Sequence, residues 1–61
     1  MGSDHAARLI AEADKCAGDA ARIRAFARTL DRPHVVDELL VVAARLEESS
    51  VKLRSLAEQI R

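Results

Sequence analysis

The most reactive side chain in this 61-residue sequence is its single cysteine, Cys16. A thiol can form a disulfide with the same residue of a second chain if the two Cα atoms come within about 4.4–6.8 Å. A buried thiol without a basic neighbour is unreactive and packs as a small apolar side chain. The sequence therefore allows two interpretations of Cys16: a redox switch between chains, or a core thiol that shares a layer with Ser50.

Two histidines, His5 and His34, stand beside or near the aspartates Asp4 and Asp31. Imidazole and carboxylate groups bind zinc, but helical zinc sites normally use ligands at i and i+4, and no two of these four residues have that spacing. The single cysteine also excludes zinc-finger spacing. We therefore expect no metal and no cofactor, and we expect solvated histidines at the ends of the fold, where their protonation would affect association.

Four arginines cluster between residues 22 and 32, opposed there only by an aspartate. They are Arg22, Arg24, Arg28 and Arg32. Guanidinium groups hold phosphate or acidic partners, and positive charge also suits the C-terminal end of a helix. Because Phe26, the only aromatic residue, is expected to pack, no ring remains to stack on bases. A solvated face is therefore the simpler interpretation of the cluster, and contact with RNA or another anion is the alternative.

The sequence gives no arrangement suited to catalysis. The acidic pairs Asp37–Glu38 and Glu47–Glu48 are adjacent in sequence, so their side chains diverge on a helix. There is no glycine-rich phosphate loop and no nucleophile paired with a base. We expect a protein that is not an enzyme.

Composition limits the elements that can position these residues. The chain is 49% hydrophobic and 33% charged with zero net charge, which argues against disorder and against nonspecific coating of nucleic acid. No apolar run approaches the ~18–20 residues of a membrane span, and a lone thiol fits a reducing compartment, so we expect a cytoplasmic protein. Residues 1–3 are interpreted as a cloning remnant, because Ala6 does not fit a myristoylation motif.

The pattern predicts an all-α fold with two helices. The first helix is expected over about residues 4–30, capped by Ser3 or Asp4, with a turn at 31–33 and a second helix over about 33–60. Pro33 ends the first helix and suits the first turn of the second. So short a turn predicts an antiparallel helical hairpin, and a single kinked helix is the alternative.

A heptad repeat runs through both predicted helices, with small residues at position a and large residues at position d. The a positions are Ala6, Ala13, Ala20, Ala27, Val36, Ala43, Ser50 and Ala57. The d positions are Leu9, Cys16, Ile23, Leu30, Leu39, Leu46, Leu53 and Ile60. Folding the chain about Pro33 pairs one large aliphatic residue with one alanine in six of eight layers, as close packing requires.

The hairpin alone buries too little to be stable, so self-association is expected. Apolar residues also occupy the flanking g positions, where Phe26, Val42 and Leu56 join the set expected in the core or the dimer contact. We predict that positions a, d and g face a second hairpin and form a homodimeric four-helix bundle. Apolar residues left outside, such as Ile10, Leu40 and Val41, would allow a tetramer or contact with another protein.

This pattern resembles the Rop family of plasmid RNA-binding proteins. The likeness rests on alanine at a, leucine at d, about sixty residues and a short turn, with local similarity at Leu30–Asp31 and residues 43–46. The resemblance implies an antiparallel dimer of hairpins. Rop binds RNA through basic and polar residues around a phenylalanine on its first helices. The only lysines in this chain are Lys15 and Lys52, and we expect Phe26 to be packed. The RNA-binding site of Rop therefore does not carry over residue by residue.

The predicted function is a small homodimeric interaction module, a scaffold or regulator without a catalytic site. An RNA-binding regulator that uses the arginine cluster is one alternative, and a designed bundle with no biological partner is another.

Overall fold

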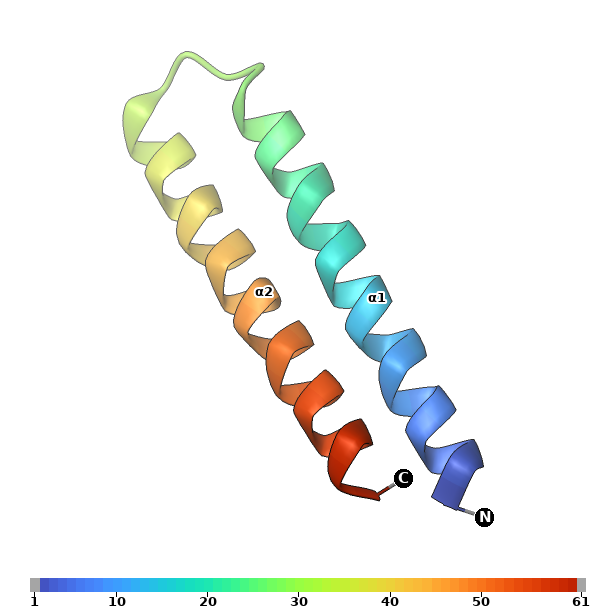
Figure 1. The fold of residues 1–61 in the computed structure, drawn as a ribbon. Coiled ribbons are helices and arrows are strands. Elements are labelled where there is room, and N and C mark those ends of the chain that lie inside the picture. The colour runs from blue at the N-terminus through green and yellow to red at the C-terminus, as the bar shows by residue number, and fades with distance from the viewer. Residues whose placement is uncertain (1, 61) are drawn as a thin grey trace.

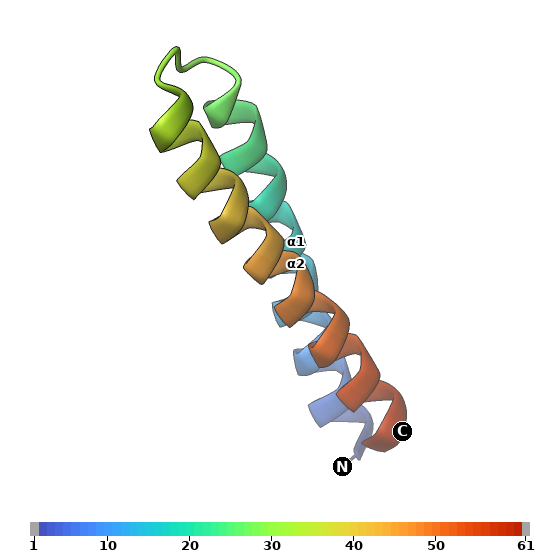
Figure 2. The ribbon, with the colours of Figure 1, turned by 90° about the vertical axis from the view of Figure 1, so that its left-hand side faces the viewer.

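Two helices lie side by side and antiparallel, with both chain ends at the same end of the molecule (Figure 1). The computed structural model describes residues 2–60, with the side chains of residues 4–60. Helix α1 spans Gly2–Ala27 and helix α2 spans Pro33–Ile60. The Cα atoms extend over 48 × 13 × 9 Å, and an edge-on view shows a single two-helix layer (Figure 2). The predicted hairpin is confirmed, and the alternative of one kinked helix is wrong.

Helix α1 begins at Gly2, before the capping residues that the sequence suggests. Asp4 therefore lies inside the first turn, where its carboxylate interacts favourably with the positive end of the helix. The side chain of Ser3 and the whole of Met1 lie outside the described part of the chain. Over residues 2–60, neither helix combines the length and the hydrophobicity needed to cross a membrane.

Helix α1 ends at Ala27, three residues before the predicted end, because local hydrogen bonds tighten the chain there. The Thr29 amide and hydroxyl both donate to the Phe26 carbonyl oxygen, at 2.9 and 2.7 Å. The Leu30 amide donates to the Ala27 carbonyl oxygen at 3.2 Å. These i→i−3 bonds replace the α-helical pattern and satisfy carbonyl groups at the helix end.

Helix α2 has the predicted bounds, and Pro33 is its first residue. Proline suits this position because the missing amide would have no partner in the helix. The Val36 amide donates to the Arg32 carbonyl oxygen at 3.0 Å, so the helical ladder starts directly at the proline. The connection is therefore residues 28–32.

The contact between the helices is a seam of small side chains. Six of the twelve alanines are buried, and all six lie at position a, whereas none of the six exposed alanines does. Ser50, also at position a, is 5% exposed, and only Val36 at that position is half-buried. Among the described residues no large side chain is fully buried. The small residues let the two backbones approach closely, and the seam is the whole core of the hairpin.

The large residues at position d lie beside the seam rather than within it. Every d residue is half-buried except Ile60, which is exposed. This differs from the expectation that position a faces a second hairpin, because α1 and α2 already cover that position between them. Positions d and g remain available for further contact.

Candidate interaction surfaces

The heptad places two unlike faces on the hairpin. Each residue turns by about 100°, so d and g lie on one side of position a, and e and b lie on the other. In an antiparallel pair the equivalent sides of both helices point the same way. Leu9 and Ile60, both at position d, line one depression, and Arg24 and Leu40, both at position e, line another, which confirms this arrangement.

The apolar face is defined here as the apolar residues at positions d and g of both helices. Its half-buried members are Leu9, Cys16, Ile23, Leu30, Leu39, Leu46 and Leu53. Its exposed apolar members are Phe26, Val35, Val42, Leu56 and Ile60. Phe26 is 57% exposed in the single hairpin, so its expected packing stays a prediction that depends on a second hairpin. The ring lies beyond the seam because position g points away from the other helix.

Polar side chains close the apolar face at the open end of the hairpin. A depression of about 300 Å³ is lined there by Leu9 and Ile60 together with His5, Arg8 and Glu12. Since Leu9 comes from α1 and Ile60 from α2, the depression crosses between the helices. The apolar face is therefore continuous across both helices at this end.

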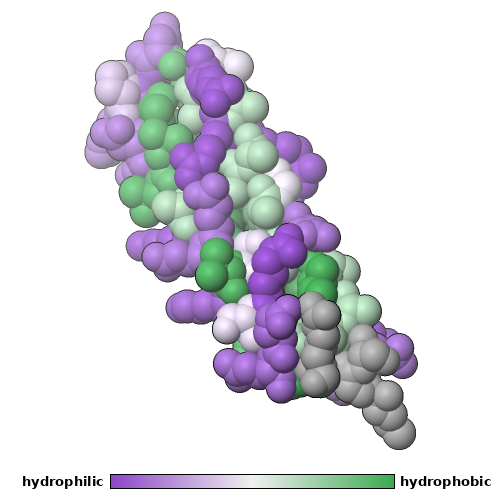
Figure 3. Space-filling view, in the orientation of Figure 1, coloured by the Kyte–Doolittle hydropathy of each residue, from purple (hydrophilic) through white to green (hydrophobic). Residues whose placement is uncertain are grey.

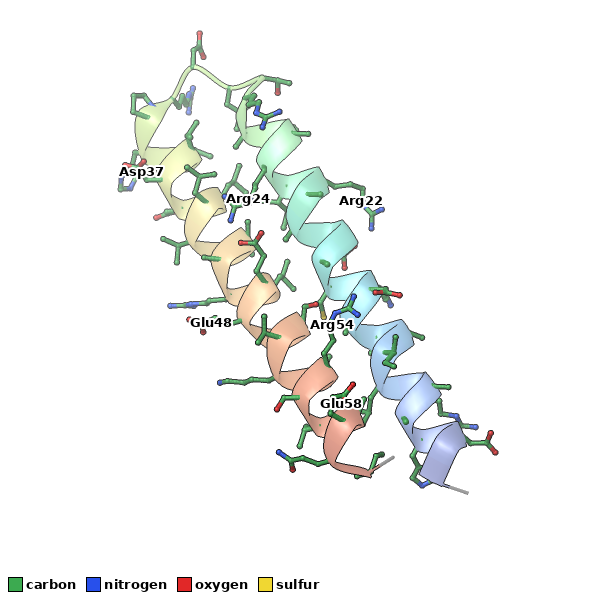
Figure 4. The ribbon with its side chains drawn as sticks, in the orientation of Figure 1. Arg22, Arg24, Asp37, Glu48, Arg54 and Glu58 are labelled. Atoms are coloured by element: carbon green, nitrogen blue, oxygen red, sulfur yellow. The ribbon has the colours of Figure 1, made fainter. Side chains whose placement is uncertain are left out.

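The charged face is defined here by four e and b residues that form two ion pairs across the seam. Arg24 of α1 donates to Glu47 of α2, and Arg54 of α2 donates to Asp14 of α1. Figure 4 shows Arg24 and Arg54 between the two ribbons, while Arg22, Asp37 and Glu48 point outward. Hydrophilic side chains run lengthwise over this face, with apolar patches on either side (Figure 3).

The ion pairs follow a division of charge along each helix. Residues 4–19 carry four acidic and two basic residues, whereas residues 22–32 carry four arginines and one aspartate. Residues 37–48 are again mainly acidic, and residues 52–61 mainly basic. In an antiparallel hairpin each basic half lies beside an acidic half. This distribution of acidic and basic residues is visible in the sequence and predicts ion pairs across the seam.

The arginine cluster does not form one continuous surface. Arg24 pairs with Glu47 across the seam, whereas Arg22 pairs with Asp19 on its own helix and is 74% exposed. Arg24 and Arg28 line a common groove near the turn, and Arg32 is exposed in the turn itself. The structure thus brings two of the four arginines together.

The other candidate residues are spread along the molecule. Cys16 has a half-buried free thiol. His5 lies near the open end and His34 near the turn, where its Nε2 atom is 3.6 Å from Oε1 of Glu38. Over the described chain, no group of three or more His, Cys, Asp or Glu residues is placed to hold a metal ion.

Comparisons with protein-family models, curated proteins and solved structures give no match. The structure shows the antiparallel two-helix hairpin that the Rop resemblance implies, and no family match supports Rop itself.

Proposed function

We propose that a second copy of the chain covers the apolar face, and that the resulting four-helix bundle is a small interaction module without catalytic chemistry. The observation that carries this proposal is the absence of any fully buried large side chain among the described residues. Burial of large aliphatic side chains is the main driving force of folding. A hairpin that leaves its leucines half-covered therefore needs a partner for them.

The exposed area of the chain supports a contact of ordinary size. The chain exposes 4695 Å², whereas a compact monomer of 6.7 kDa exposes about 3,900 Å². The difference, roughly 800 Å², is about what one partner buries in a standard interface. A twofold dimer is the simplest closed assembly that covers this area on both copies.

The outer surfaces of such a dimer would serve as binding sites. Leu40, Val41 and Val51 lie at positions e, f and b, away from the apolar face, and all three are exposed. A dimer would leave them in contact with water. We infer that these residues serve contact with another protein or formation of a tetramer.

An RNA-binding role is the second candidate, and the exposed ring of Phe26 favours it. Arg22 precedes Phe26 by four residues on α1, so guanidinium and ring share one side of the helix. Exposed rings beside arginines stack on unpaired bases. The test is a gel shift with an RNA hairpin at low salt, in which replacement of Arg22 and Arg28 abolishes binding if this candidate is right. Absence of any shift removes it.

Molecular mass in solution tests the main proposal. We expect sedimentation equilibrium over a dilution series to give twice the chain mass at high concentration, and Leu46→Glu to give a monomer. Val51→Glu is the matched control, because it adds the same charge at a residue that is 68% exposed outside the apolar face. A fully helical monomer at every concentration would overturn the proposal, and a mass of four chains would show the tetramer.

A further inference from the structure

A groove near the turn lies on the same side of the hairpin as the charged face. It has a volume of about 250 Å³ and is lined by Arg24, Ala27, Arg28, Val36 and Leu40. Its alanine, valine and leucine come from both helices and provide an apolar floor. Both arginines belong to α1; Arg24 is paired with Glu47, so Arg28 provides the positive charge of the basic rim.

The groove stays accessible in the proposed dimer. Its rim and Leu40 occupy positions e and b, whereas the second copy covers positions d and g. Arg24 is held in place by its ion pair with Glu47, and its side chain is 38% exposed. The groove is therefore available to a partner other than the second copy.

The lining selects for a particular chemistry. An apolar floor stabilises an aliphatic or aromatic side chain by removing it from water. Arginine binds carboxylates through planar, often bidentate hydrogen bonds. A phosphate backbone would match the rim but would leave Val36 and Leu40 without an apolar partner.

We propose that this groove binds an acidic peptide segment of a partner protein, with an apolar side chain on the floor and a carboxylate on Arg28. The proposal rests on the proposed function, because it names the partner chemistry of the interaction module. Charge complementarity between the basic rim and the acidic segment gives the complex its specificity.

The test uses the full chain and a fluorescein-labelled helical peptide that carries Leu and Glu on one face. We expect saturable binding by fluorescence anisotropy, and loss of binding when the peptide carries Gln for Glu or Ala for Leu. Arg28→Glu should weaken binding roughly 5- to 10-fold, since one attraction becomes a repulsion. A peptide with Lys in place of Glu should recover binding to that variant.

Arg22→Glu is the matched control, because it makes the same change of charge on α1 outside the groove. We expect it to leave peptide binding unchanged. Equal weakening by both variants, no binding of the acidic peptide, or tighter binding of a labelled RNA hairpin to the same groove would each overturn the proposal. Sedimentation of the same samples measures the dimer separately, so a failed groove and a failed dimer are distinguishable.

Discussion

The two faces of the hairpin are held by different physics, although the same heptad generates both. The apolar face carries large side chains that the hairpin covers only in part, whereas the charged face carries ion pairs that are complete within one chain. Exposed ion pairs contribute about 0–1 kcal/mol each, and burial of one leucine contributes about 1.5–3 kcal/mol. The connection between the helices sets which halves lie together, and the ion pairs add only a small contribution. The apolar face would supply most of the energy if the proposed second copy covers it.

The largest expected effect comes from filling the seam between the two faces. Ala20 is fully buried, so the larger side chain in Ala20→Leu has no space between the backbones. We expect a loss of about 3 kcal/mol or more, enough to disrupt or rearrange the hairpin. Urea unfolding followed by circular dichroism measures the loss. Ala25→Leu adds the same atoms at an exposed alanine and should unfold near the wild-type midpoint; equal midpoints for both variants would contradict the seam.

A loss of similar size, without rearrangement of the hairpin, is expected on the apolar face. Leu46 is half-buried in the hairpin and would be fully buried in the dimer. Leu46→Ala should then lower the free energy of unfolding by about 2–5 kcal/mol, and its melting temperature should depend on concentration more steeply than that of the wild type. Scanning calorimetry at several concentrations measures both. A loss near zero would mean that this face remains in water.

Gly18 offers a change of opposite sign that belongs to neither face. It lies in the interior of α1, and a Cβ atom at this position meets nothing within 4 Å. Gly18→Ala should stabilise the protein by about 0.5–1 kcal/mol, because alanine loses less backbone entropy in a helix. A higher urea midpoint with unchanged sedimentation is the expected result. A lower midpoint would show that another chain approaches this residue closely.

The smallest effect is expected on the charged face. Arg24 and Glu47 are both partly exposed, so the coupling energy from an Arg24→Met and Glu47→Gln double-mutant cycle should be about 0.2–1 kcal/mol. High salt should reduce it further. A coupling that exceeds the loss from Leu46→Ala would reverse the ranking of the two faces.

Position in the heptad allowed most of the fold to be predicted. The seam was predictable because alanine or another small residue recurs every seventh position, and the helix break was predictable from Pro33. The early end of α1 was not predictable, because it depends on hydrogen bonds of Thr29 and Leu30 that the local composition does not indicate. Phe26 was expected to pack against a second hairpin, and hydrophobicity alone does not separate a residue covered by the same chain from one that a second chain would cover.

The candidate surfaces were less predictable than the fold. The arginine cluster was identified from the sequence. Whether each arginine lines the groove, pairs across the seam or points into solvent depends on the side of α1 from which its side chain projects. The groove itself needs residues from both helices. Folding the chain about Pro33 gives an approximate alignment of the two helices along their axes, but it does not show which side chains line a common groove.

The alanine seam has a consequence for how the two helices keep their alignment. Because its small residues recur every seventh position, a slip of one helix by about 10.5 Å along the other would again place small residue against small residue. The alanine seam alone therefore does not fix the axial alignment of the two helices. The stop lies elsewhere, in the five-residue connection at 28–32 and in the two ion pairs, which a slip would pull apart. The connection and the two ion pairs thus fix the axial position of one helix relative to the other.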